Sequence, residues 1–139
     1  MPNDHSLPTN AELIDHATRF LNPYTTPDGR LFGDVASRLV TASGALHSGV
    51  CIDTGFCAEH SAIAAMVTAG EYQITKIVAV WRDERDGKLY VLPPCGRCRE
   101  FIRQMDPANL DTDVILGMHK SAPLRELLPA HEWPEPLES

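Results

Sequence analysis

Apolar residues near the start of the chain recur at the spacing of one face of an α-helix. A mobile polar arm is expected over residues 1–10, and either Thr9 or Asn10 is a suitable N-cap for the helix that follows. Pro23 ends this helix. The predicted apolar face consists of Leu13, Ile14, Ala17, Phe20 and Leu21.

The apolar segments that follow have the composition and spacing of strands. After a loop rich in Pro, Gly and Asp, two strands are predicted over residues 37–42 and 45–52. Residues 75–83 contain the continuous apolar run IVAVW, which is typical of a central strand that is covered on both faces. Residues 89–92 are short and extended, and a further strand is predicted over residues 112–118.

Predicted helices separate these strands. Residues 57–70 are apolar almost all round, which indicates a buried helix. Another helix begins near Gly96, and a short one over residues 122–130 precedes a Pro-rich tail over residues 130–139. This order of elements predicts an α/β protein in which helices cover both faces of a sheet.

Composition and charge narrow the class of protein. The chain of 139 residues is expected to form a single domain, and its 43% hydrophobic and 22% charged residues are those of an ordinary soluble protein. It contains no apolar run of the ~18 residues that a membrane span needs, and its first residues lack a signal-peptide core. A cytoplasmic location with reduced cysteines is therefore expected. The net charge of −7 and the scattered basic residues disfavour a nucleic-acid partner.

The candidate chemistry lies in the four cysteines, Cys51, Cys57, Cys95 and Cys98. Taken alone, the pair Cys95 and Cys98 fits half of a metal site, a redox dithiol or ordinary packing. A thioredoxin-like dithiol would follow the first strand of its fold, whereas this pair comes late in the chain. The remaining cysteines decide between a metal site and packing.

Cys57 opens one predicted helix, and Cys95 and Cys98 open the next. If the strand between them runs parallel to its neighbours, both helix N-termini lie near one sheet edge and the three thiolates converge. Helix N-termini stabilise thiolates, and three ligands leave one position of a zinc ion open for catalysis, although Cys51 could close it in a structural site. Glu59 lies in the first turn, where burial would raise its pKa toward the range useful for proton transfer.

The motif CAE at residues 57–59, combined with PCGRC at residues 94–98, resembles the signature of the zinc-dependent cytidine deaminase family. The resemblance extends from about residue 37 to residue 133. It implies a three-layer α/β/α fold with a mixed central sheet, and a homotetramer or dimer. It also implies that the three cysteines bind Zn²⁺ while Glu59 moves protons during hydrolytic deamination of a small-molecule substrate, a free cytosine nucleoside such as cytidine or deoxycytidine.

The same resemblance implies contacts to the substrate. The backbone of Ala58 and Pro94 would contact the exocyclic amino group of the ring. Trp133 resembles an aromatic residue that closes the pocket in related deaminases, although a packing role fits it equally. A cation near the zinc would offset the charge of three thiolates, and the candidates are Arg97, Arg99 and His60.

The sequence departs from the family where the sugar is held. Cys51 and Asp53 stand where cytidine deaminases have an Asn-x-Glu triplet that holds the ribose, and the link from Asp53 to Cys57 is shorter. Asp53 is therefore a candidate substrate contact, although a turn residue at the end of the strand fits it equally. Arg97 in the PCGRC motif is most similar to the blasticidin S deaminase branch, so deamination of blasticidin S or another modified cytosine nucleoside is the alternative. A nucleic-acid deaminase and a non-catalytic zinc module are further alternatives.

Overall fold

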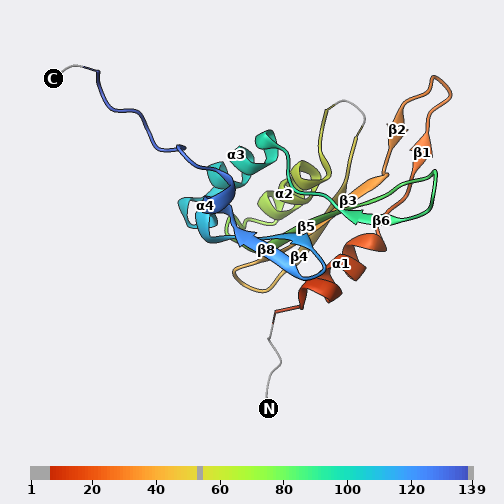
Figure 1. Cartoon of the computed structure of the whole chain (residues 1–139), viewed down its shortest axis with the longest axis horizontal. Coiled ribbons are helices and arrows are strands. Elements are labelled where there is room, and N and C mark those ends of the chain that lie inside the picture. The colour runs from red at the N-terminus through yellow and green to blue at the C-terminus, as the bar shows by residue number, and fades with distance from the viewer. Residues whose placement is uncertain (1–6, 53–54, 138–139) are drawn as a thin grey trace, which may run out of the picture.

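The computed structural model of the chain describes residues 7–52 and 55–137. A mixed sheet forms the middle layer, with α1 on one face and α2 and α3 on the other (Figure 1). In chain order the elements are α1 (Asn10–Thr18), β1 (Tyr24–Thr25), β2 (Leu31–Phe32), β3 (Val35–Thr41), β4 (Leu46–Val50), α2 (Ala58–Thr68), β5 (Ile74–Arg82), β6 (Leu89–Val91), α3 (Gly96–Met105), the 3₁₀-helix η1 (Pro107–Asp111), β7 (Asp113–Gly117), β8 (Lys120–Pro123) and α4 (Leu124–Leu127). The predicted three-layer α/β/α class is confirmed.

The sheet has the strand order β4-β3-β5-β7-β8, and β6 pairs with the end of β5. The pairs β3–β4, β3–β5, β5–β6 and β7–β8 are antiparallel, whereas β5 and β7 are parallel. As the apolar run IVAVW predicts, β5 is central, and four of its successive residues, from Ile77 to Val80, are buried. No helix in the described part of the chain is both long and apolar enough to cross a membrane.

Helix α1 begins as its sequence predicts but ends earlier. Thr9 is the N-cap, and Leu13, Ile14 and Ala17 are buried against the sheet. The helix ends at Thr18, before Phe20, which is 44% exposed and lies beside the guanidinium of Arg38. The expectation that Phe20 belongs to the buried helical face is therefore wrong, because the helix has already ended there.

Helix α2 packs closely on the sheet, yet it is not buried all round. Ala62, Ile63 and Met66 are fully buried, whereas Ala64 and Ala65 are exposed, so the prediction of a wholly buried helix is wrong for one side. The close approach depends on Gly49 in β4, because a Cβ at that position would lie 2.4 Å from the backbone nitrogen of Ala62.

The apolar spacing of the sequence does not predict the short elements β1, β2, η1 and β8. The loop after α1 contains the two-residue strands β1 and β2, η1 follows α3, and β8 extends the sheet beyond β7. Each is too short to show a period of its own. Strand β8 forms only because β7 provides an edge with free backbone hydrogen-bonding groups.

Candidate metal centre

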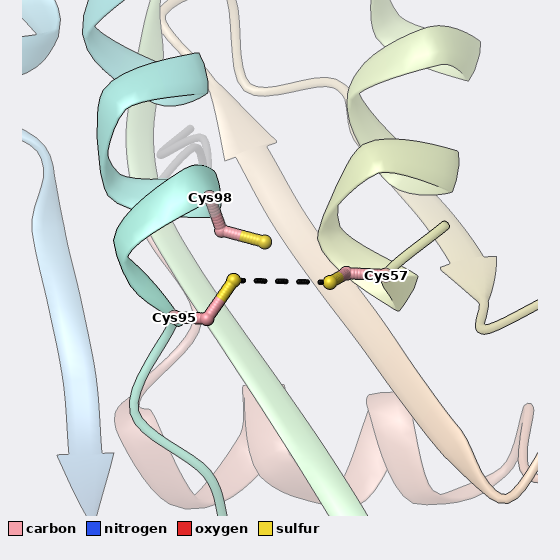
Figure 2. A group of neighbouring side chains, drawn as sticks. All are labelled: Cys57, Cys95 and Cys98. Atoms are coloured by element: carbon pink, nitrogen blue, oxygen red, sulfur yellow. Dashed lines mark hydrogen bonds between the residues drawn. The ribbon is translucent and has the colours of Figure 1, made fainter. Parts of the chain in front are cut away.

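Three thiols meet between the N-termini of α2 and α3. Figure 2 shows the side chains of Cys57, Cys95 and Cys98 pointing toward one another from these two helices. The Sγ atoms of Cys57 and Cys95 lie 3.8 Å apart, and all three Sγ atoms lie within 4.8 Å of one another. Tetrahedral zinc with Zn–S bonds of about 2.3 Å requires sulfur atoms about 3.8 Å apart, so the three thiols fit a zinc ion.

Both helices begin with a cysteine at the N-cap position. Cys57 has φ −66° and ψ 157°, and Cys95 has φ −70° and ψ 171°, which is the extended geometry of an N-cap. Neither side chain makes a capping hydrogen bond to its helix. The thiols are therefore directed toward one another instead of back toward the backbone, and Cys98 reaches them from the first turn of α3.

The chain reaches the second N-terminus by a route that differs from the expected one. Convergence was expected if the strand between the two helices runs parallel to its neighbours, and β5 is parallel to β7 but antiparallel to β3. In the structure β5 and β6 form an antiparallel hairpin, and the backbone N–H of Leu92 then donates to the carbonyl of Ala79, 2.9 Å away. The returning strand carries Cys95 back along β5 to the N-terminus of α2, and the convergence itself is confirmed.

The local environment affects the three thiols differently. Burial raises the pKa of Cys98, and the nearby charge of Glu59 raises it further. Burial also raises the pKa of Cys57. Burial acts in the same direction on Cys95, but the proximity of its thiol to the backbone N–H groups of the first turn of α3 and to the thiols of Cys98 and Cys57 outweighs burial and lowers the pKa of Cys95. A metal ion would favour all three thiolates, because coordinating thiols are deprotonated.

Glu59 lies beside the thiols in a buried position. Its side chain is only 6% exposed, and burial raises its pKa, opposed by hydrogen bonds from its own backbone N–H and from Cys98. An adjacent pocket of about 180 Å³ is lined by Val35, Cys51, Cys57, Ala58, Glu59, Leu92, Pro93 and Cys95. The pocket therefore combines two of the candidate metal ligands, a carboxyl group suited to proton transfer and apolar walls.

The predicted backbone contacts lie at this pocket. Ala58 lines it directly. Pro94 is buried between two lining residues, and its carbonyl accepts a hydrogen bond of 2.8 Å from Nε of Arg99. Arg99 also donates to the carbonyl of Leu127 through Nη1, at 3.0 Å. The guanidinium of Arg99 thus joins the start of α3 to α4.

The other two candidates for charge balance differ from each other. Nη1 of Arg97 donates to the carbonyl of Gly55 at 2.5 Å. His60 is 5% exposed and its ring packs between Phe56 and Phe101, at centroid distances of 5.4 and 4.5 Å. Burial and then the charge of Arg97 lower the pKa of His60, which favours the neutral ring near pH 7. The two arginines are therefore the better candidates for a cation.

The remaining predicted contacts are not brought together in the described chain. Asp53 lies outside the described residues, as do residues 1–6 of the expected N-terminal arm. Trp133 is 90% exposed on the C-terminal segment that extends away from the sheet, and it does not line the pocket (Figure 1). Its role at the pocket stays a prediction.

Cys51 lies directly after the strand in which it was predicted, and away from the candidate metal ligands. It lies one residue beyond β4 and lines the pocket outside the group of three thiols, so it does not close the metal site. Its thiol donates a hydrogen bond to Oδ1 of Asp34 at 3.0 Å. No pattern in the sequence indicated Asp34, because only the pairing of β3 with β4 places this residue beside Cys51.

Comparison with known proteins agrees with this geometry. The chain is 33% identical to the blasticidin-S deaminase of Bacillus cereus over 103 residues, which span 68% of this chain and 74% of that protein. The chain belongs to the cytidine deaminase-like family. Membership places it among hydrolytic deaminases and confirms the resemblance of the CAE and PCGRC motifs.

Solved structures of cytidine deaminases show the same fold. The enzyme from Bacillus anthracis matches with a TM-score of 0.69 and 21% identity, over 88% of each chain. The enzyme from Burkholderia pseudomallei matches with a TM-score of 0.66 and 23% identity, over 88% of this chain and 98% of that one. No protein-family model matches the chain. At these identities the structural likeness supports the fold, while the sequence relative supports the family.

Proposed function

We propose that the protein catalyses zinc-dependent hydrolytic deamination of a free cytosine nucleoside and releases ammonia. The observation that carries this proposal is the meeting of three thiols at zinc spacing beside a pocket that the buried carboxyl of Glu59 lines. Three protein ligands suit a catalytic zinc, which keeps one coordination position for water or substrate.

Different residues at the pocket would bind the metal and transfer protons. Cys57, Cys95 and Cys98 would hold the zinc ion, which when bound supplies Lewis-acid activation of a water molecule. Glu59 takes one proton from that water and delivers it to the ring nitrogen of the cytosine. The water oxygen forms a bond to the ring carbon, and the bond from that carbon to the exocyclic nitrogen breaks. Glu59 then passes the second proton to the departing ammonia.

Burial of Glu59 supports this role. A carboxyl group that accepts and returns protons near neutral pH works best when its pKa is raised toward that pH. The apolar surroundings of Glu59 raise its pKa in this direction. The backbone of Ala58, which lines the pocket, and the carbonyl of Pro94, which accepts a hydrogen bond from Arg99, would contact the exocyclic group.

Blasticidin S is the second candidate substrate. The sequence relative bears the name of a blasticidin-S deaminase. The pocket wall also carries Cys51 instead of the amide expected for holding a ribose, which favours a modified nucleoside. The homotetramer and the cytoplasmic location implied by the family stay predictions.

A substrate panel tests the proposed function. Cytidine, deoxycytidine, cytosine, blasticidin S and N4-substituted cytidines are incubated with protein of measured zinc content, and released ammonia or amine is quantified. Ammonia release from at least one nucleoside, lost on chelation and restored by zinc, is expected. If no compound releases ammonia or an amine, the substrate class is wrong.

The panel needs two companion measurements to exclude the other functions. Binding to single-stranded DNA and RNA at low salt is expected to be absent, since the chain carries a net charge of −7. A non-catalytic zinc module would retain its zinc without releasing ammonia from any compound. Zinc content and ammonia release measured on the same sample therefore distinguish the two functions.

A further inference from the structure

A second polar pair lies beyond the three thiols, with Cys51 on the pocket wall and Asp34 beside it. Cys51 lines the pocket together with Val35 and Leu92, and its thiol donates to Oδ1 of Asp34 at 3.0 Å. Asp34 is partly exposed. The carboxyl group is thus fixed beside a pocket residue without being sealed in the core.

Backbone contacts hold this pair in place on both sides of Asp34. The N–H of Gly33 donates to the carbonyl of Cys51 at 3.1 Å, and the N–H of Cys51 donates to the carbonyl of Val35 at 3.0 Å. Gly33 has φ 75°, and a Cβ there would lie 2.2 Å from the carbonyl oxygen of Asn22, so only glycine fits. Asp34 therefore lies between the two residues whose backbones bond to Cys51, directly before β3 begins.

The charges of the pair indicate what it can bind. Burial raises the pKa of Cys51, and the hydrogen bond to Asp34 raises it further, so the thiol is a neutral donor. A carboxylate offers about four acceptor positions, of which the thiol uses one. The described residues that line the pocket include no Lys or Arg, so this wall attracts hydrogen-bond donors and disfavours phosphate.

We propose that the Asp34 carboxylate, held by Cys51, accepts a hydrogen bond from a hydroxyl or amino group of the substrate outside the reacting cytosine ring. The proposal rests on the proposed function and names the part of the substrate that sets specificity. Either group would act as a hydrogen-bond donor to Asp34. Its sources are the sugar hydroxyls of a nucleoside and the amino groups of a blasticidin-like side chain.

Steady-state kinetics of Asp34→Asn test the proposal, because the substitution keeps the shape of the side chain and removes its charge. The amide oxygen still accepts a hydrogen bond but carries no charge, and loss of this charge assistance is expected to raise KM up to about tenfold, with kcat and zinc content little changed. Cytidine and 2′,3′-dideoxycytidine distinguish the sources. A KM increase for cytidine but not for the dideoxy compound assigns the 2′- or 3′-hydroxyl, and an equal increase for both assigns the 5′-hydroxyl that both carry. An increase confined to blasticidin S assigns its amino groups.

Two further variants separate recognition from folding. Cys51→Ser keeps a donor to Asp34 and is expected to retain a KM near that of the wild type, whereas Cys51→Ala is expected to raise it. Asp111→Asn removes an exposed carboxylate that pairs with Arg125, away from the pocket, and is expected to leave KM unchanged. If Asp34→Asn does not fold, the comparison of Cys51→Ala with Cys51→Ser gives the same answer.

Two results overturn the proposal, and they are distinguishable. If the wild type deaminates nucleosides but Asp34→Asn, or Cys51→Ala in its place, shows an unchanged KM for every substrate, the pair has no role in recognition and the proposed function stands. If the wild type with zinc bound deaminates none of the substrates, the proposed function fails and the assignment of Asp34 fails with it.

Discussion

The N-terminus of α1 differs from the N-termini of α2 and α3 in how it treats the unpaired backbone N–H groups of the first helical turn. Each helix is preceded by an extended N-cap residue. At α1, the hydroxyl of Thr9 accepts from the backbone N–H of Glu12 at 3.1 Å, and the Glu12 carboxylate accepts from the N–H of Thr9 at 2.9 Å. At α2 and α3 the cap positions hold Cys57 and Cys95, which make no such bond.

The helix end of α1 thus carries a side-chain cap that stabilises the helix, whereas the helix ends of α2 and α3 carry candidate metal ligands. A capping box satisfies backbone donors that the first turn of a helix leaves unpaired. At α2 and α3 those donors and the positive end of the helix dipole remain available to the thiolates. The two helices thereby forgo the stabilisation of a side-chain cap and gain ligands whose positions are set by rigid elements.

Glu59→Gln, in the first turn of α2, tests proton transfer and has the largest expected effect. The amide cannot transfer protons, so turnover on the best substrate of the panel is expected to fall by about 10²–10⁴-fold. Zinc content and thermal unfolding are the accompanying measurements, and both should show an intact metal site. Glu126→Gln, at an exposed position, is the control. Turnover close to that of the wild type would remove Glu59 from the mechanism.

Cys95→Ser replaces a candidate zinc ligand at the N-cap of α3 by a residue that can cap the helix. Serine is a favoured N-cap, so the metal-free protein is expected to gain up to about 1 kcal/mol in free energy of unfolding. Zinc content should fall at the same time, because a hydroxyl is a poor zinc ligand beside two thiolates. Metal analysis and denaturant unfolding after chelation measure the two effects. Cys51→Ser, outside the three thiols, should keep its zinc; a similar loss there would contradict the assignment of ligands.

The buried carboxyl of Glu59 is expected to make stability depend on pH. Its pKa in the folded protein is raised above the ordinary value of 4.5, so between the two pKa values the folded state binds more protons than the unfolded state. Stability from this group is then lost as the pH rises through that window. In chelator-treated protein, Glu59→Gln is expected to raise the free energy of unfolding at pH 7 and to have no such advantage below about pH 4.5. An equal effect at both pH values would contradict the shift.

Thr9→Ala tests the capping box of α1 and should have the smallest effect. Loss of the capping box is expected to cost about 1 kcal/mol in free energy of unfolding. Zinc content and kcat/KM should stay at the values of the wild type, because α1 lies on the other face of the sheet. Thr18→Ala, at the end of the same helix, is the matched control. A change in metal content would show that the two faces of the sheet are coupled.

Much of this architecture could be predicted because its signals are local. The apolar run IVAVW predicted the central strand, and Thr9 was one of the two expected caps of α1. The exposed side of α2 could not be predicted, because Ala64 and Ala65 are apolar wherever they lie. Strand β8 could not be predicted either, since its residues are ordered by the edge of β7 rather than by a period of their own.

The candidate site shows the same division. The sequence by itself indicated the candidate metal ligands and the candidate proton-transfer group, because the spacing of Cys95 and Cys98 and the motif CAE depend only on the first turns of two helices. Only the tertiary structure decided how these groups meet, through the antiparallel return of β6, and which residue stands beside Cys51. The physical reason is that helix starts are encoded by neighbouring residues, whereas contacts across the sheet depend on strand pairing between distant parts of the chain.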